Sequence, residues 1–145
     1  MHPVLSRRRF EEDIAGITPE LCAERQWEVF QCVFLVFDVG FTAPDGARLR
    51  TRFLCDDWND RPPAIELRDY GGSLLSSVEP NRTSVFNGSA HSITGRPFVC
   101  MRGSREYHTH DSHQADLWEN LKKSPDYRLG EIVTQVWRAW RREHP

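Results

Sequence analysis

Apolar residues near the amino terminus recur at the spacing of one face of a helix. They are Phe10, Ile14 and Ile17. Ser6 can cap this helix and Gly16 ends it, so the pattern predicts a helix from Ser6 to about Ala15. A longer stripe of the same period lies near the carboxyl terminus and consists of Leu129, Ile132, Val133, Val136, Trp137 and Trp140. It predicts an amphipathic helix that packs on a sheet, opened by Ser124 and Pro125.

The part of the chain between these helices has the period of strands. From Trp27 to Phe41 both alternating sets of positions are apolar, which predicts one strand that is covered on both faces. Residues 49–55 alternate apolar residues with arginines and predict a half-buried strand, and residues 64–68 predict a short one. Residues 79–95 are rich in Asn, Ser, Thr and Gly and predict irregular structure. A further helix is expected after a cap at Asp111 or Ser112, and its apolar residues are Leu117, Trp118 and Leu121.

This order of elements predicts an α+β fold, with an N-terminal helix, a meander of antiparallel strands and C-terminal helices. The chain has 145 residues and no repeat or low-complexity linker, so a single domain, residues 1–145, is expected. The formal net charge of −2 argues against nucleic acid as a partner. No apolar run has the length of a signal peptide or a bilayer span, which predicts a cytoplasmic protein without a membrane partner. In that compartment the four scattered cysteines stay reduced.

Residues able to do chemistry are concentrated between residues 96 and 113. They are Cys100, Glu106, His108, His110 and His113. A reactive cysteine needs a base or a stabilised thiolate, and imidazole can supply either. The same thiolate, carboxylate and imidazole groups are zinc ligands, although their spacing is not that of a standard zinc finger. The plainer alternative is a core cysteine followed by histidines on a solvated loop. The residues alone therefore leave a nucleophile, a metal ligand and a core residue open for Cys100.

The layout of the chain resembles the ubiquitin-conjugating fold. Pro62-Pro63 precedes a short strand, Phe98-Val99-Cys100-Met101 gives the cysteine an apolar setting, and Trp118 and the helix at residues 129–140 follow. The same segment resembles a predicted metal-binding bacterial family that is named for a Cys-Glu-His-His pattern and is associated with ubiquitin-like conjugation operons. The residues that match this pattern are Cys100, Glu106, His108 and either His110 or His113.

One motif of the conjugating family is not matched. Its members carry His-Pro-Asn, with the Asn eight residues before the cysteine, and here that position is Ser92. Asn87 or a histidine after Cys100 is the available substitute for the side chain that supports the oxyanion.

These resemblances imply a carrier enzyme that works without a cofactor. Cys100 would accept a ubiquitin-like modifier from an activating enzyme as a thioester and pass it to an amine of a protein acceptor, in bacterial anti-phage defence. Glu106, His108 and His110 would be its catalytic neighbours. The first alternative is a protein of the same operons that binds Zn²⁺ through Cys100, Glu106, His108 and His113. The second is a catalytically inert module that binds the modifier.

Overall fold

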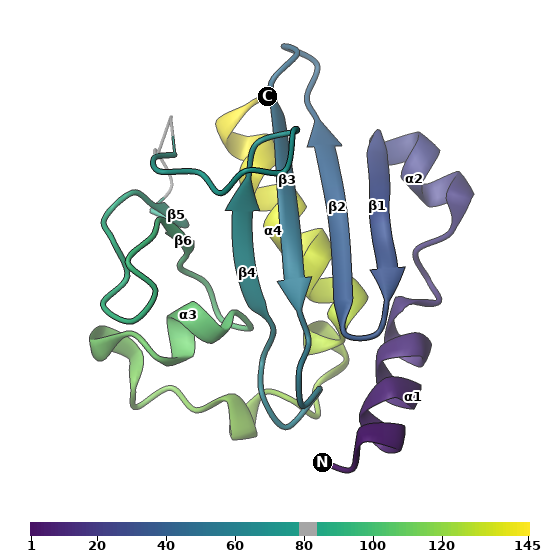
Figure 1. Ribbon diagram of the computed structural model, residues 1–145, viewed down its shortest axis with the longest axis vertical. Coiled ribbons are helices and arrows are strands. Elements are labelled where there is room, and N and C mark those ends of the chain that lie inside the picture. Colours follow the sequence, from purple (N-terminus) through teal and green to yellow (C-terminus); the bar gives the residue numbers. More distant parts are fainter. Residues whose placement is uncertain (79–83) are drawn as a thin grey trace.

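A four-stranded antiparallel sheet forms the centre of the computed structural model, which describes residues 1–78 and 84–145 (Figure 1). Its strands follow the order of the chain and are β1 (Trp27–Val33), β2 (Val36–Thr42), β3 (Arg48–Leu54) and β4 (Ala64–Arg68). Helices α1 (Pro3–Ile14) and α2 (Pro19–Arg25) precede the sheet, and α4 (Leu129–Glu143) is the last element. The prediction of an α+β fold with an N-terminal helix, a strand meander and a C-terminal helix is confirmed.

A second group of short elements lies beside β4. It contains the paired strands β5 (Phe86–Asn87) and β6 (Phe98–Val99) and the one-turn helix α3 (Arg105–His108). Three single 3₁₀ turns then lead to α4, and they are η1 (Asp111–His113), η2 (Trp118–Asn120) and η3 (Pro125–Tyr127). The irregular structure predicted for residues 79–95 falls partly on residues 79–83, which lie outside the described residues.

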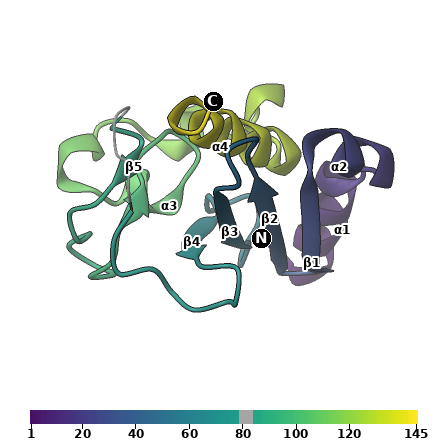
Figure 2. The same ribbon diagram turned by 90° about the horizontal axis from the view of Figure 1, so that it is seen from above.

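Helix α4 covers one face of the sheet (Figure 2). Its predicted apolar stripe is confirmed, since Leu129, Ile132, Val133 and Val136 are fully buried. They pack in one cluster with inward-facing residues of the strands, which are Phe37, Val39, Phe41 and Phe53. Burying an aliphatic side chain of this size contributes about 1.5–3 kcal/mol, so this layer is the main source of stability.

The other face of the sheet carries the arginines that the alternating pattern of β3 predicted to point outward. Arg50 and Arg52 both contact Asp38 of β2 at 2.8 Å. The Asp38 side chain is fully buried, and the two guanidinium groups balance its charge and donate hydrogen bonds to it. Arg50 also lies over the ring of Phe30 at 4.0 Å. Within residues 1–78 and 84–145, no helix combines the length and apolar character needed to traverse a bilayer.

The single strand predicted from Trp27 to Phe41 is wrong, because the chain reverses at Phe34-Leu35 and forms the β1–β2 hairpin. β1 is an edge strand, and Val33 is 65% exposed. The hairpin loop escaped detection because it has none of the usual turn residues. The loop carries an apolar residue, Phe34, because its ring packs edge-on against Phe10 of α1, with the ring centroids 5.6 Å apart.

The helix predicted after Asp111 is also wrong. Residues 111–120 form only η1 and η2, and Leu117 is 52% exposed rather than packed on a helix face. Pro125 begins η3, and α4 starts four residues later, at Leu129. Helix α2 was not predicted, because Gly16 and Pro19 together were interpreted as the end of the first helix. Pro19 is instead the first residue of α2, where its missing N–H costs nothing, and Thr18 caps the helix.

Candidate functional site

Cys100 lies directly after β6, at the start of a tight turn that leads into α3. Its backbone N–H donates to Val85 O at 2.6 Å, and the Ser104 hydroxyl donates to Val99 O at 2.7 Å. Gly103 has φ +96°, a conformation that favours glycine, and a Cβ there would meet Ile132 Cγ1 at 3.3 Å. The turn is therefore held both by the strand and by the core beneath α4. Cys100 itself is half-buried.

The thiol of Cys100 has one imidazole neighbour, His113. Their Sγ and Nε2 atoms are 3.7 Å apart, within hydrogen-bond distance for sulfur. Burial raises the pKa of the Cys100 thiol, so the resting group is a thiol rather than a thiolate. His113 Nε2 is placed to accept the proton when the sulfur attacks an electrophile.

The imidazole of His113 is oriented by Tyr107. The two rings stack with centroids 4.0 Å apart and an interplanar angle of 13°. Tyr107 is fixed in turn, because its hydroxyl donates to Asp116 Oδ2 at 2.7 Å, and Arg102 Nε donates to the same oxygen at 2.7 Å. The hydrogen bond from Tyr107, together with Arg102, holds the pKa of the Asp116 carboxyl below its usual range. A charged carboxylate therefore anchors the ring on which His113 rests.

His108, predicted as a catalytic neighbour, has both ring nitrogens engaged by the backbone. Nδ1 lies 2.9 Å from Asp116 O, and Nε2 lies 3.1 Å from Gly103 N. A carbonyl only accepts and an amide only donates, so Nδ1 carries the proton and Nε2 is the acceptor. Burial lowers the pKa of His108, which keeps this neutral form. His108 therefore braces the turn around Gly103 and has no nitrogen left for a substrate or a metal ion.

Glu106, the second predicted neighbour, faces β4. It is 5% exposed, and its Oε1 accepts the Ile65 N–H at 2.9 Å. Burial raises the pKa of the Glu106 carboxyl to about 7. The backbone of the same residue is used as well, because buried His91 donates through Nε2 to Glu106 O at 2.9 Å. The contact with Ile65 attaches α3 to β4, and the contact with His91 attaches α3 to the turn before β6.

His110, the third predicted neighbour, lies next to the Cys100–His113 pair. Its ring centroid is 5.8 Å from that of His113, and it stacks on Phe98 at 5.7 Å. Its Nδ1 accepts the Ser112 N–H at 3.1 Å and so caps η1, the turn that carries His113. Of the three predicted neighbours of Cys100, only His110 has a ring next to that of His113, the residue that contacts the thiol.

The zinc hypothesis does not fit this arrangement. In the described part of the chain, no group of three or more His, Cys, Asp or Glu side chains is disposed to hold a metal ion. Of the proposed ligands, Cys100 and His113 meet, while Glu106 binds the edge of β4 and both nitrogens of His108 are engaged. No step below is derived through a metal.

The predicted substitutes for the missing oxyanion support are Asn87 and a histidine after Cys100, and His113 is the histidine whose Nε2 lies beside the thiol. Ser92 is exposed in a turn closed by the Gly95 N–H and His91 O at 2.7 Å. Asn87 lies on β5, and its Oδ1 accepts the Ser89 N–H at 2.9 Å. The substitution proposed for the missing Asn stays a prediction.

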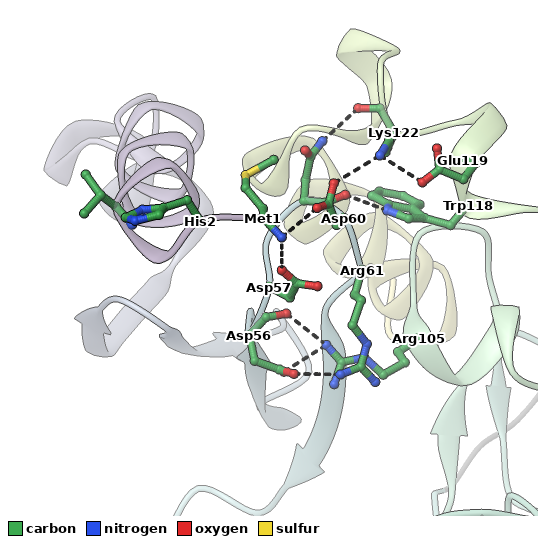
Figure 3. A network of polar contacts seen from close by, with 12 residues as sticks. Met1, His2, Asp56, Asp57, Asp60, Arg61, Arg105, Trp118, Glu119 and Lys122 are labelled. Atoms are coloured by element: carbon green, nitrogen blue, oxygen red, sulfur yellow. Dashed lines mark hydrogen bonds and ion pairs between the residues drawn. The ribbon is translucent and has the colours of Figure 1, made fainter.

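A polar network ties the segment after Cys100 to the loop between β3 and β4 (Figure 3). Arg105 Nη2 contacts Asp56 Oδ1 at 2.9 Å, and Lys122 Nζ contacts Asp60 Oδ1 at 3.2 Å. The Trp118 indole N–H donates to Asn59 O at 2.8 Å, although η2 is far from this loop in sequence. These contacts fix the irregular segment after Cys100 against the loop between β3 and β4.

The orienting residues Tyr107, Asp116 and Arg102 were not identified from the sequence. Their signal is weak, because Arg102 and Asp116 are 14 residues apart and neither lies in a recognisable motif. A scan against protein-family models finds no match for this chain, and neither does a search of curated proteins. Geometry therefore carries the functional argument.

Proposed function

We propose that the protein is a carrier enzyme that holds an acyl group, the carboxyl end of a ubiquitin-like modifier, as a thioester on Cys100 and passes it to an amine. The observation that carries the proposal is the half-buried Cys100 thiol with His113 Nε2 at 3.7 Å. The partners would be an activating enzyme, the modifier and a protein acceptor. No cofactor is required for either transfer.

The arrangement of elements supports a ubiquitin-conjugating-like fold as part of this proposal. An N-terminal helix, a four-strand meander, Pro62-Pro63 directly before β4, and an extended segment into the cysteine occur in that family's order. Helix α4 then crosses the sheet. The departure at Ser92 means that donors to the oxyanion must come from other groups of the site.

The first transfer is a thioester exchange. As Cys100 Sγ attacks the thioester carbonyl on the activating enzyme, His113 Nε2 accepts the thiol proton. An S–C bond to Cys100 forms, and the bond to the activating enzyme's sulfur breaks. That sulfur leaves as a thiolate and takes the proton that His113 accepted, so His113 is again free to accept a proton and no oxidant or reductant is consumed. The Tyr107 stack holds His113 for this step.

The second transfer forms the product. A neutral amine attacks the carbonyl carbon and gives up one proton to His113 Nε2, the C–S bond breaks, and that proton passes to the Cys100 thiolate. The leaving ability of a thiol falls as its pKa rises. Because burial raises the pKa of Cys100, its thioester is less prone to hydrolysis than one on an acidic thiol.

A partner-free assay tests the proposal. The protein is incubated with a small-molecule thioester of N-acetylglycine, and then with butylamine. Mass spectrometry is expected to find an acyl group on Cys100 that is released by a reducing thiol and consumed by the amine. Cys32 is exposed and provides the matched control, since Cys32→Ser should acylate normally while Cys100→Ser forms no thiol-sensitive adduct.

The same variants can be used with a candidate activating enzyme and a ubiquitin-like modifier, in the presence of ATP. A band that is sensitive to reducing agent and absent in Cys100→Ser is expected. Equal acylation of Cys32 and Cys100 by the small thioester, together with no band in the complete system, would contradict the carrier function.

A further inference from the structure

A cluster of arginines surrounds Trp137 at the carboxyl-terminal end of α4. The arginines are Arg25, the last residue of α2, and Arg138, Arg141 and Arg142 of α4. A hollow of about 380 Å³ is lined by Arg25, Trp137, Arg138 and Arg141, together with Thr42 and Pro44. A shallower hollow, lined by Trp137, Arg142 and Pro145, adjoins it along the helix. We call the two together the α4 basic surface.

Within the described residues, the arginines of the α4 basic surface are not paired with acidic side chains. Arginines elsewhere are, for example Arg50 and Arg52 with Asp38. The contrast is informative because the chain as a whole carries a net charge of −2. The one acidic residue that lines the hollow, Glu24, is exposed and leaves an excess of positive charge.

Arg25 is held in place without any carboxylate. Its Cζ lies 5.0 Å from the ring centre of Trp27 and 4.9 Å from that of Trp137. Its Nη1 donates to Thr134 Oγ1 at 3.0 Å. A guanidinium fixed in this way pays little ordering entropy when it binds an anion. Arg141 is restrained as well, by donation from Nε to His144 O at 3.3 Å.

We infer that the α4 basic surface binds an acidic peptide segment of a partner protein. Arginine clusters recognise carboxylates through charge-assisted, bidentate hydrogen bonds. Arg138, Arg141 and Arg142 lie on neighbouring turns of one helix face and can meet successive acidic side chains. The Trp137 ring and Pro44 offer apolar contact to a residue between them. The surface is open along the helix, which suits an extended chain better than an enclosed small molecule.

Acidic peptide is favoured over nucleic acid by the extent of the charge. A nucleic acid backbone needs a basic track that neutralises many phosphates, whereas this surface is short and the chain is acidic overall. The inference does not depend on Cys100, so it can fail or succeed independently of the carrier function.

The probe is a fluorescein-labelled peptide of alternating Glu and Asp with one central Leu, and binding is followed by fluorescence anisotropy. The charge-reversal variant is Arg138→Glu/Arg142→Glu, because both side chains are exposed. The matched control, Arg8→Glu/Lys123→Glu, makes the same change in net charge at exposed positions elsewhere. The first variant is expected to weaken binding at least about tenfold, and the control to leave it within about twofold.

Binding that weakens as salt is raised, and a peptide with Gln and Asn in place of the acids that fails to bind, would support the inference. Equal loss in the two variants would overturn it, because it would show an effect of net charge alone. Absence of binding at low salt would overturn it as well. Tighter binding of a single-stranded oligonucleotide, lost in Arg138→Glu/Arg142→Glu, would reassign the surface to nucleic acid.

Discussion

The layer formed by α4 and the sheet differs from the segment between Cys100 and Asn120 in what holds it together. The first is held by interlocking apolar side chains such as Ile132 and Phe53, both fully buried. The second has one-turn helices and an exposed Leu117, and it is held by hydrogen bonds from side chains to a distant backbone. Most of the residues predicted as catalytic, namely Glu106, His108 and His110, therefore hold the backbone of this segment in place.

The comparison separates residues that look alike in sequence. Glu106 accepts a hydrogen bond from the Ile65 amide, and His108 accepts one from the Gly103 amide. His113 has its Nε2 next to the thiol of Cys100. A cluster of His and Glu is thus no proof of catalysis, because the same groups satisfy buried backbone atoms where regular structure is absent. Variants of the two regions should show this division of labour.

Ile132→Ala should have the largest effect on stability. Truncating a fully buried isoleucine leaves a cavity under the sheet and is expected to lower the free energy of unfolding by about 2–5 kcal/mol. Urea denaturation measures the loss. A decrease below about 1 kcal/mol would mean that the α4 layer is not the main source of stability.

Glu106→Gln should change how stability depends on pH. The pKa of Glu106 is raised to about 7 in the fold, so its stabilising contribution is complete below about pH 4.5 and is lost as pH rises through 7. The wild type should lose up to about 3 kcal/mol over this range that Glu106→Gln does not lose. Denaturation of both proteins at several pH values gives the difference, and parallel curves would refute the assignment.

His108→Leu should destabilise by about 1–3 kcal/mol. The substitution leaves the Gly103 N–H and Asp116 O without their partners inside the turn. The matched variant is His113→Leu, which removes a partly exposed ring and should cost less than about 1 kcal/mol. Thermal or urea denaturation of the pair compares the two histidines directly. Equal costs would abolish the distinction drawn between them.

His113→Gln should have the smallest effect on stability and the clearest effect on chemistry. Loss of the proton acceptor beside Cys100 is expected to slow acyl transfer at least about tenfold, with unfolding within about 0.5 kcal/mol of the wild type. Single-turnover acylation by the small thioester gives the rate. An unchanged rate at neutral pH would remove His113 from the mechanism.

The sequence predicted the parts that obey local rules. The stripe from Leu129 to Trp140 has a helical period that only one face can bury, and the arginines of β3 alternate as a half-exposed strand requires. The β1–β2 hairpin was missed because its loop contains Phe34 in place of a usual turn residue. Phe34 is there because it packs against Phe10 of α1, a contact that no local pattern reveals. The segment around Cys100 was predicted only as a set of residues. Its hydrogen bonds join positions as far apart as Ile65 and Glu106, and no local period encodes such pairs.

The partial burial of the Cys100 thiol affects how fast the thiol is oxidised by peroxide. Peroxide reacts with the thiolate form of cysteine, and the rate follows how much thiolate is present. Because burial raises the pKa of Cys100, little thiolate exists near neutral pH, and the sulfur escapes most oxidation to sulfenic acid. The proposed carrier function would therefore persist in peroxide longer than the activity of an enzyme with an acidic cysteine.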